Sequence, residues 1–311
     1  MFCCLGLAMC HSREVSTAPK EFAFDVVVVG SANLDLVATL DHLPKPGETI
    51  VALGYAEHAG GKGVNQAVAC ARMGARTAFV GCVGNDDAGV FLRGVLENEG
   101  IDTSMLHVVD MPTGRAFINV DVHGENEIVV LSGANTQVGV AQNPFVLPTS
   151  QVLLMQLEIP LTTVTAALTA ARNNGSITVL NPAPYQSLTD EILSLVDVIV
   201  PNETESAACG GSQALLDAGV KTVLTTLGER GALINTHTSA TSIAPHKVLA
   251  VDTVGAGDAF IGALSAELAR GAAINDAAAV GAVAGALATT VHGAVPSLPT
   301  QKSVRSAMNK S

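Results

Sequence analysis

The sequence predicts an α/β protein whose doubly wound, mainly parallel central sheet has helices on both faces and a small β-sheet lid beside it. Two observations support this fold class. Short runs of β-branched residues alternate along the chain with segments that carry apolar residues at helical spacing, as in parallel sheets buried on both sides. Two other stretches alternate apolar and polar residues, which is typical of half-exposed strands.

The predicted core elements follow one another in chain order. We expect strands at 26–29, 77–80, 152–156, 178–180, 196–200 and 220–225. Helices are predicted at 63–73, 88–99 and 161–173, because apolar residues recur there every three or four positions. The uncharged 277–291 segment is too short to span a membrane and is rich in Ala and Gly, which predicts a buried helix.

The two alternating stretches, 48–55 and 116–131, predict a small separate sheet. Open α/β sheets bind ligands beyond the carboxyl ends of their strands, so we expect this sheet to lie there as a lid. The chain as a whole divides into a flexible N-terminal extension (1–23), one α/β domain (24–300) and a C-terminal tail (301–311).

Composition narrows the classes of ligand. The chain has 311 residues, 48% of them hydrophobic, and a formal net charge of −12. This charge argues against nucleic-acid or anionic-membrane partners, which require a basic surface, and we expect small-molecule ligands. The six cysteines show no zinc-binding spacing and the start of the chain shows no signal peptide. We therefore expect a cytoplasmic protein with reduced thiols.

The segment from Asp252 to Asp258, DTVGAGD, is the most informative motif. The small residues Gly255, Ala256 and Gly257 let backbone N–H groups face an anion at the start of a helix. A carboxylate beside a phosphate repels it, so its presence there suggests that it has a separate task. Asp258 would have such a task as the base that takes a proton during phosphoryl transfer. The alternative is an ordinary acidic helix N-terminus.

Two earlier motifs suit a polyhydroxyl ligand. Asn33 and Asp35 follow the first strand and can hydrogen-bond diols, although such residues are also common turn formers. The 60–66 loop, GGKGVNQ, combines a flexible backbone with one cation but departs from the Walker pattern at Gly63. It favours a sugar over a triphosphate, with a plain helix-entry turn as the alternative.

Acidic residues or glycines follow three later strands. Glu158 follows one strand, and Asn202, Glu203 and Glu205 follow another. A hydrated Mg²⁺ would be a natural partner for these acids, and helix N-capping by Asn202 is the alternative. The glycines of the 225–231 turn would let a nucleotide approach the backbone, but a hairpin explains them equally well. The 292–297 segment, taken alone, indicates an ordinary loop.

Taken in order, the motifs resemble the ribokinase branch of the PfkB carbohydrate kinase family, from about Phe24 to Pro299. Members share a DTxGAGD signature, which Asp252–Asp258 matches in full. The 60–66 loop is characteristic of the ribokinase branch, and the 181–184 (NPAP) and 201–205 (PNETE) segments are also similar to it. The 206–219 segment is shorter than in most members, which predicts a trimmed outer helix.

The resemblance implies a role for each matching position. Asp258 would be the catalytic base, with Gly255, Ala256 and Gly257 as the anion hole. Sugar-binding positions match Asn33, Asp35, Gly60, Gly61, Lys62, Asn65, Glu158 and Asp258. Nucleotide-binding positions match Asn202, Thr226, Leu227, Gly228, Glu229, Arg230, Gly231 and Gly257. Glu205 matches an acid that organises Mg²⁺ through water. A monovalent cation, usually K⁺, would lie at Asp252, Val254, Ala288, Val291, Gly293 and Ser297.

The activity that the resemblance implies is ATP-dependent phosphorylation of D-ribose at O5, which yields D-ribose 5-phosphate and ADP. Alternatives are another sugar or nucleoside kinase of the family, such as a deoxyribokinase or an adenosine kinase, or a catalytically silent sugar- or nucleotide-binding regulator. The loop that contains Lys62 favours a free sugar. By analogy with the family, we expect a homodimer formed through the lid sheet.

Overall fold

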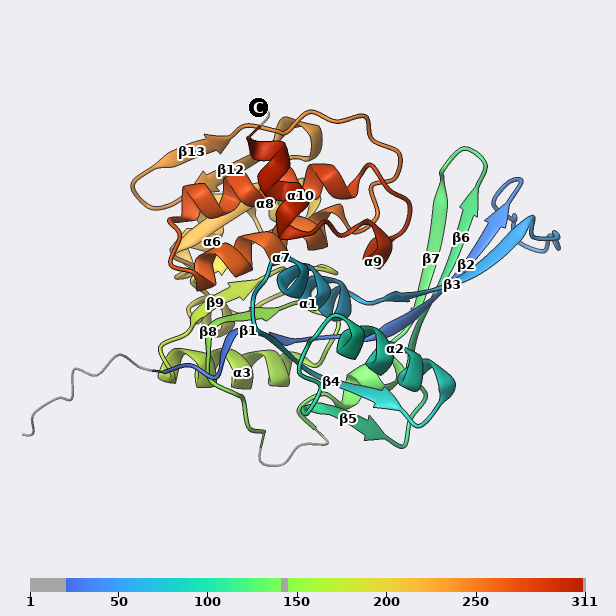
Figure 1. Ribbon diagram of the computed structural model, residues 1–311, viewed down its shortest axis with the longest axis horizontal. Helices are drawn as coiled ribbons and strands as arrows, with labels where there is room; N and C mark the ends of the chain where they lie inside the picture. The colour runs from blue at the N-terminus through green and yellow to red at the C-terminus, as the bar shows by residue number, and fades with distance from the viewer. Residues whose placement is uncertain (1–20, 141–144, 310–311) are drawn as a thin grey trace, which may run out of the picture.

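The computed structural model describes residues 21–140 and 145–309. Within these ranges the core is a nine-stranded sheet (Figure 1). Its strands run parallel except for β12 and β13, which form an antiparallel edge, so the predicted sheet is confirmed. From edge to edge the strands are β13 (Ala240–Ile243), β12 (Ala232–Asn235), β11 (Thr222–Thr226), β10 (Val198–Ile199), β9 (Ile177–Leu180), β8 (Ser150–Met155), β1 (Phe24–Val29), β4 (Thr77–Gly84) and β5 (Leu106–Val109).

Strand β1 shows why the core strands are continuously apolar. Val26 and Val28 pack into the hydrophobic cluster on one face of the sheet, and Val27 and Val29 pack into the cluster on the other. All four side chains are fully buried. Because successive side chains point to opposite faces, a strand covered on both sides has no position that favours a polar residue.

Helices cover both faces of the sheet (Figure 1). One face is covered by α1 (Lys62–Arg72), α2 (Asp87–Asn98), α7 (Ala256–Ala269), α8 (Ile274–Ala288) and α10 (Gln301–Met308). The other is covered by α3 (Leu161–Asn173), α4 (Asp190–Leu193) and α6 (Gly211–Asp217). The remaining helical turns are α5 (Glu203–Ala208), α9 (Ala294–Ser297), η1 (Gly133–Gln137) and η2 (Gly228–Arg230). In the described part of the chain, no helix has the length and apolarity needed to span a bilayer.

A second, four-stranded sheet projects from the core (Figure 1). Its order is β3 (Gly54–Gly60), β2 (Asn33–Leu40), β6 (Gly114–Asp121) and β7 (Asn126–Leu131). The β6–β7 hairpin confirms the strands predicted at 116–131. The outer pairs are antiparallel, whereas β2 and β6 pair in parallel.

Two expectations about the lid were wrong. The strand predicted at 48–55 lies at Gly54–Gly60 instead, because Glu48 belongs to a turn in which its carboxylate accepts a hydrogen bond from the backbone N–H of Lys45. Asn33 and Asp35 do not form a turn after β1 but open the lid strand β2, which pairs antiparallel with β3 from Asn33 opposite Gly60.

Most of the C-terminal tail expected at 301–311 is helical. Residues Gln301–Met308 form helix α10, whose N-terminus is capped by the Thr300 hydroxyl. Val304 is fully buried in the core beside α8. An amphipathic segment of two turns therefore completes the covering of α8. Most of the extension predicted at 1–23 lies outside the described residues.

Candidate active site

The candidate site lies where the carboxyl ends of β1, β8, β9 and β10 meet the N-termini of α1 and α7. Because these strands are parallel, the residues that follow them emerge at one edge of the sheet. Ser31 follows β1, Glu158 follows β8, and Asn181 follows β9. Hydrogen bonds join all three to helix α1 or to the turn that begins it.

Asp258 lies in the first turn of α7 and is 9% exposed. Its Oδ2 accepts a 2.9 Å hydrogen bond from Asn65 Nδ2, and its Oδ1 accepts one of 2.9 Å from Gln66 Nε2. Each carboxylate oxygen keeps a further lone pair for a substrate hydroxyl. The candidate base is therefore buried, oriented and directly connected to the motif that the sequence assigns to the sugar.

The turn before Asp258 requires glycine. Gly255 has a φ of 79° at the N-cap of α7, and a Cβ built on it would lie 3.0 Å from the Cα of Ala294. A left-handed backbone and the close approach of another segment both exclude larger residues. The first-turn N–H groups of a helix have no partner within the helix. The N–H of Ala256 donates a long, 3.3 Å hydrogen bond to the carbonyl oxygen of Thr253. Gly255, Ala256 and Gly257 together present a cradle suited to an anion, which would compete for that N–H.

The glycines of the 60–66 loop let the lid and α1 approach closely. A Cβ on Gly60 would lie 2.1 Å from a carboxylate oxygen of Asp35, so a larger residue there would have to displace that side chain. Lys62 begins α1 directly after Gly61. The backbone N–H of Lys62 donates a 3.0 Å hydrogen bond to Glu158, which also accepts a short hydrogen bond from the Ser31 hydroxyl.

Charged groups in the site influence one another. Burial raises the pKa of Asp35 to about 7, and the carboxylates of Glu158 and Asp258 add to the shift. Burial disfavours the charge of Lys62, but the carboxylates of Asp258, Glu158 and Glu205 together outweigh it and raise the lysine's pKa. The charged form of Lys62 is therefore stabilised by the surrounding acids.

Asn202 lies beside Thr226, the first residue of the 226–231 turn. Thr226 pairs with Asn202 in a parallel bridge and donates its N–H to Pro201. The turn is a hairpin between β11 and β12, as one reading of its glycines predicted. Asn202 and Glu205 form a capping box at the start of α5, so the capping alternative is also present. That box uses one carboxylate oxygen of Glu205, which leaves the other for solvent or a hydrated ion.

Hydrogen bonds of Asp252 join two of the segments that carry the positions assigned to a monovalent cation. Asp252 Oδ2 accepts a 2.8 Å hydrogen bond from the N–H of Gly293, and its Oδ1 accepts one of 2.9 Å from Val254. Ala288 ends α8, Val291 follows it, and Ser297 ends α9. The donors available here are carboxylate, carbonyl and hydroxyl oxygens. This all-oxygen set suits a hard cation.

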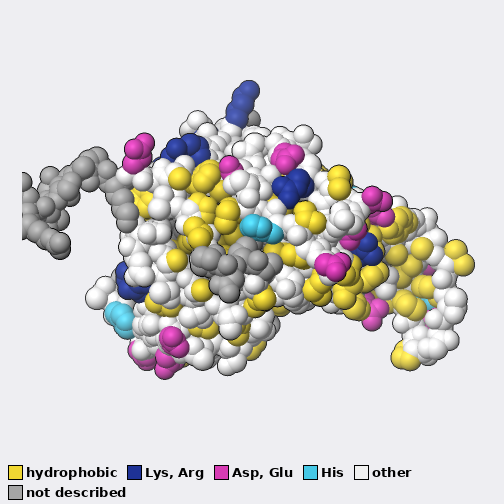
Figure 2. All heavy atoms as spheres, turned by 90° about the horizontal axis from the view of Figure 1, so that it is seen from below, with side chains coloured by type: hydrophobic (Ala, Val, Ile, Leu, Met, Phe, Trp, Pro, Cys, Tyr) yellow, Lys and Arg dark blue, Asp and Glu magenta, His cyan; other side chains and the backbone are white. Residues whose placement is uncertain are grey.

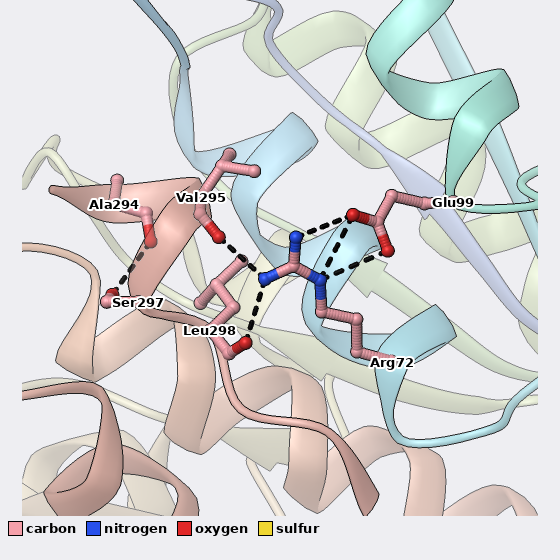
Figure 3. A network of polar contacts seen from close by, with 6 residues as sticks. All are labelled: Arg72, Glu99, Ala294, Val295, Ser297 and Leu298. Carbon is pink, nitrogen blue, oxygen red and sulfur yellow. Dashed lines mark hydrogen bonds and ion pairs between the residues drawn. The ribbon is translucent and has the colours of Figure 1, made fainter. Parts of the chain in front are cut away.

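An arginine from α1 binds two backbone carbonyls in and next to α9 (Figure 3). Arg72 Nη1 donates to the carbonyl oxygens of Val295 and Leu298 at 2.7 and 2.8 Å. Its other nitrogens donate to the Glu99 carboxylate, the closest at 2.6 Å. Helix α1 is thus tied at its first turn to the base and at its last turn to α9.

Several buried polar residues of the site were missed from the sequence. Asn135 Nδ2 donates to Asn33 Oδ1 at 2.7 Å and so fixes that side chain. Gln66, Gln156 and Asn181 form a hydrogen-bonded chain that ends on Asp258. Their shared signal was a side-chain amide directly after a core strand or inside the first turn of α1, where an apolar residue would be expected.

Taken together, the structure is that of an α/β protein with a small second sheet and a buried carboxylate, that of Asp258, directly after a glycine turn at a helix N-terminus. The chain matches the pfkB family of carbohydrate kinases over residues 23–301, and it belongs to that family.

Known relatives agree. The chain is 40% identical to a ribokinase of Haemophilus influenzae over 293 residues, which cover 89% of this chain and 96% of that protein. It is 34% identical to a deoxyribokinase of Salmonella typhi over 255 residues, 76% of this chain and 83% of that one.

Solved structures show the same likeness. A crystal structure of ribokinase from Thermotoga maritima is 36% identical, with a TM-score of 0.84 over 91% of this chain and 99% of that one. The structure of Arabidopsis thaliana ribokinase complexed with ribose and ATP is 32% identical, with a TM-score of 0.84 over 92% of this chain and 99% of that one.

Proposed function

We propose that this chain is a kinase that uses ATP to phosphorylate D-ribose at O5, yielding D-ribose 5-phosphate and ADP. The observation that carries the proposal is the position of Asp258. Its carboxylate is bound by two amides of the 60–66 motif and follows directly on the glycine turn. A base for a sugar hydroxyl and an anion cradle for a phosphoryl group therefore belong to one helix terminus.

The reaction needs little beyond this arrangement. Asp258 takes the proton of the 5-hydroxyl as O5 forms a bond to the γ-phosphorus of ATP, and the bond from that phosphorus to the β,γ-bridging oxygen breaks to release ADP. The N–H groups of Gly255, Ala256 and Gly257 stabilise the charge on the transferring group. Phosphoryl transfer depends mainly on such positioning and charge stabilisation.

The sugar would lie between the lid and α1. Asn33 and Asp35 from β2, Gly60, Gly61, Lys62 and Asn65 from the loop and α1, and Glu158 after β8 are the residues proposed to hold it. Their support is proximity: β2 pairs with β3 at Asn33 opposite Gly60, and Glu158 binds the N–H of Lys62.

The nucleotide would lie along Asn202 and the 226–231 turn, with Glu205 organising Mg²⁺ through water. Mg²⁺ would neutralise charge on the ATP phosphates. K⁺ would be held by Asp252 and the carbonyl and hydroxyl oxygens of the 254 and 288–297 positions, where it would fix the segment next to the anion cradle. A location in the cytoplasm would supply ATP.

We also propose a homodimer formed through the lid. All six residues of β7 are exposed, among them Ile128, Val129 and Val130. Figure 2 shows apolar side chains gathered over this projecting end of the molecule. An exposed apolar edge strand favours association. Sedimentation should show a dimer that a Val129→Lys variant weakens, whereas a wild-type monomer at high concentration would contradict the dimer.

A coupled ATP-consumption assay tests the activity. Ribose, deoxyribose, fructose and adenosine are compared, with deoxyribose included because a deoxyribokinase is among the relatives. We expect ribose to give the highest kcat/KM. The Asp258→Asn variant should still bind ribose but turn over about 10²–10⁴ times more slowly. Activity confined to adenosine, or normal turnover by that variant, would overturn the proposal.

A further inference from the structure

Gln66 is a buried residue next to the base that the sugar and nucleotide assignments leave without a role. Its side chain is fully buried, and its Nε2 donates to Asp258 Oδ1 at 2.9 Å. Asn65 donates to the other oxygen, Oδ2. The two amides, adjacent on α1, therefore hold the two oxygens of one carboxylate.

The two amides differ in what else they can do. Asn65 is 7% exposed and its buried Oδ1 has no hydrogen-bond partner in the structure, so this side chain has capacity left for a ligand. Gln66 has no such access, because its exposure is 0% and both ends of its amide are already bonded. Its bond to Asp258 can persist while a sugar binds, whereas the bond from Asn65 can be exchanged.

The orientation of the Gln66 amide is set by a chain of partners. The backbone carbonyl of Val200 accepts from Asn181 Nδ2 at 3.0 Å, which turns Asn181 Oδ1 toward Gln66. That oxygen accepts from Gln66 Nε2 at 3.1 Å, and Gln66 Oε1 accepts from Gln156 Nε2 at 2.6 Å. A flipped Gln66 would place its oxygen against two acceptors and its amino group against a donor.

Hydrogen bonds between side chains thus connect the backbone carbonyl of Val200 to Asp258. Val200 directly follows β10, and its carbonyl can only accept a hydrogen bond, so each amide in the chain has one allowed orientation. Both ends of the Asn181 and Gln66 amides are paired, whereas Gln156 Oε1 has no hydrogen-bond partner, and buried amides paired at both ends are held rigidly. Lys62, Asp35 and Glu158 are the charged groups that also influence this region, and each contacts solvent more than Gln66 does.

We propose that Gln66 is a positioning residue that holds the carboxylate of Asp258 in the orientation needed to take the proton of the sugar hydroxyl. This inference rests on the proposed function, because it concerns the base of that reaction. Without the donor, the carboxylate gains rotational freedom about its last bond. The reacting oxygen then spends less time within reach of the 5-hydroxyl, so turnover falls while sugar binding, which depends on other residues, persists.

The test compares Gln66→Met with the wild-type enzyme and with Ser176→Ala. Methionine keeps the length and burial of the side chain but donates nothing. Ser176 is a control because it is also buried. Its replacement removes one hydrogen bond, that from its hydroxyl to the Ser150 carbonyl at 2.6 Å at the opposite end of β9, whereas Gln66→Met removes three. The kcat, the KM for ribose, ribose binding by calorimetry and the Tm are measured for each.

We expect Gln66→Met to lower kcat by about 10–100-fold while the KM and Kd for ribose change by less than about threefold. Ser176→Ala should lose thermal stability without losing kcat. A purely structural role predicts that kcat follows the Tm in both variants, so an unchanged kcat in Gln66→Met, or an equal loss in Ser176→Ala, overturns the inference.

A second variant, Gln66→Glu, guards against misfolding of the first. It keeps the size of the side chain and the oxygen that Gln156 donates to, but it replaces the amide donor with a carboxyl group, which can donate to Asp258 only while it is protonated. The kcat should therefore fall as the pH rises and this new carboxyl group ionises, with little change in KM, and a kcat that stays normal at every pH would contradict the inference. Asp258→Asn distinguishes failure of this inference from failure of the proposed function. If Asp258→Asn has a low kcat and Gln66→Met a normal one, only the positioning role is refuted. If Asp258→Asn has a normal kcat, the proposed base is refuted.

Discussion

Arg72 at the end of helix α1 donates a hydrogen bond of 2.7 Å to the carbonyl oxygen of Val295 in α9 (Figure 3). The same nitrogen also binds the carbonyl of Leu298 at 2.8 Å. These carbonyls belong to residues on either side of Ser297, one of the residues proposed to bind K⁺. Helix α1, whose side chains bind Asp258, the proposed base, therefore also binds the segment proposed to hold the cation.

Replacing Arg72 by alanine should destabilise the protein and weaken its response to K⁺. Arg72 and Glu99 are 20% and 24% exposed, so removing the arginine leaves a largely buried carboxylate and two carbonyls without their donor. We expect a loss of about 2–4 kcal/mol in the free energy of unfolding. Chemical denaturation measures this loss, and a Tm titration with KCl measures the cation response.

Arg76→Ala is the matched control. Arg76 also pairs with a carboxylate, that of Asp25, but its side chain is 65% exposed. Exposed pairs contribute about 0–1 kcal/mol, so this variant should be close to wild type in stability and K⁺ response. Equal behaviour of the two arginine variants would show that the Arg72 contacts have no special role.

Gly255→Ala should disturb both the fold and the anion cradle. The residue has a φ of 79°, and its Cβ would lie 3.0 Å from the Cα of Ala294. The left-handed conformation alone costs about 1–2 kcal/mol for an L-residue, and any shift of the turn moves its N–H groups. We expect a lower Tm together with a kcat reduced by about 10².

Gly257→Ala separates these two effects. A Cβ on Gly257 meets nothing within 4 Å, and the residue is inside α7. Alanine there should leave the free energy of unfolding unchanged or raise it by up to about 1 kcal/mol. A Tm loss as large as that of Gly255→Ala would contradict the close approach described for Gly255.

Asp252→Ala should abolish stabilisation by K⁺. A cation that binds only the folded state raises stability by RT ln(1 + [K⁺]/Kd), about 2.7 kcal/mol at one hundred times Kd. We therefore expect the wild-type Tm to rise with KCl beyond its rise with LiCl at equal ionic strength, and the variant to show no such difference. A wild-type Tm that responds equally to both salts would refute the proposed site, independently of any activity measurement.

The sequence was most informative about segments whose environment is uniform. Core strands such as Val26–Val29 are buried on both faces, so their composition alone indicates them. The lid strands Asn33–Leu40 and Gly54–Gly60 were missed or displaced because they contain Asn, Asp, Gly, Glu and His. Their strand conformation depends on pairing with each other, and intrinsic propensity is a weak guide where pairing decides.

The site residues likewise differ in whether the local sequence indicates them or distant partners determine them. The glycine turn and Asp258 could be assigned because their residue types are tied to local backbone geometry and chemistry. Gln66 could not, because its partners Gln156 and Asn181 are 90 and 115 positions away in the chain. The direction of each amide depends on a backbone carbonyl after β10, and no local pattern encodes that relationship.

Ribose affinity should weaken below neutral pH because of Asp35. Burial, with Glu158 and Asp258 nearby, raises the pKa of Asp35 to about 7, whereas an unfolded aspartate titrates near about 3.9. Between these values the folded protein binds the extra proton, so the contribution of Asp35 to stability falls as the pH rises through about 4 to 7. Sugar hydroxyls donate stronger hydrogen bonds to the ionised form of Asp35 than to its protonated form, so the effect on binding has the opposite sign.

The KM and calorimetric Kd for ribose should therefore be about tenfold higher at about pH 6 than at about pH 8, because the ionised fraction of a group with this pKa falls by that factor. Binding near pH 7 should release protons, which calorimetry detects as a dependence of the binding enthalpy on buffer. Asp35→Asn should bind ribose more weakly at high pH but with little pH dependence, since its amide does not titrate in this range. A wild-type Kd that stays constant across this range would show that the Asp35 carboxylate does not accept hydrogen bonds from the sugar.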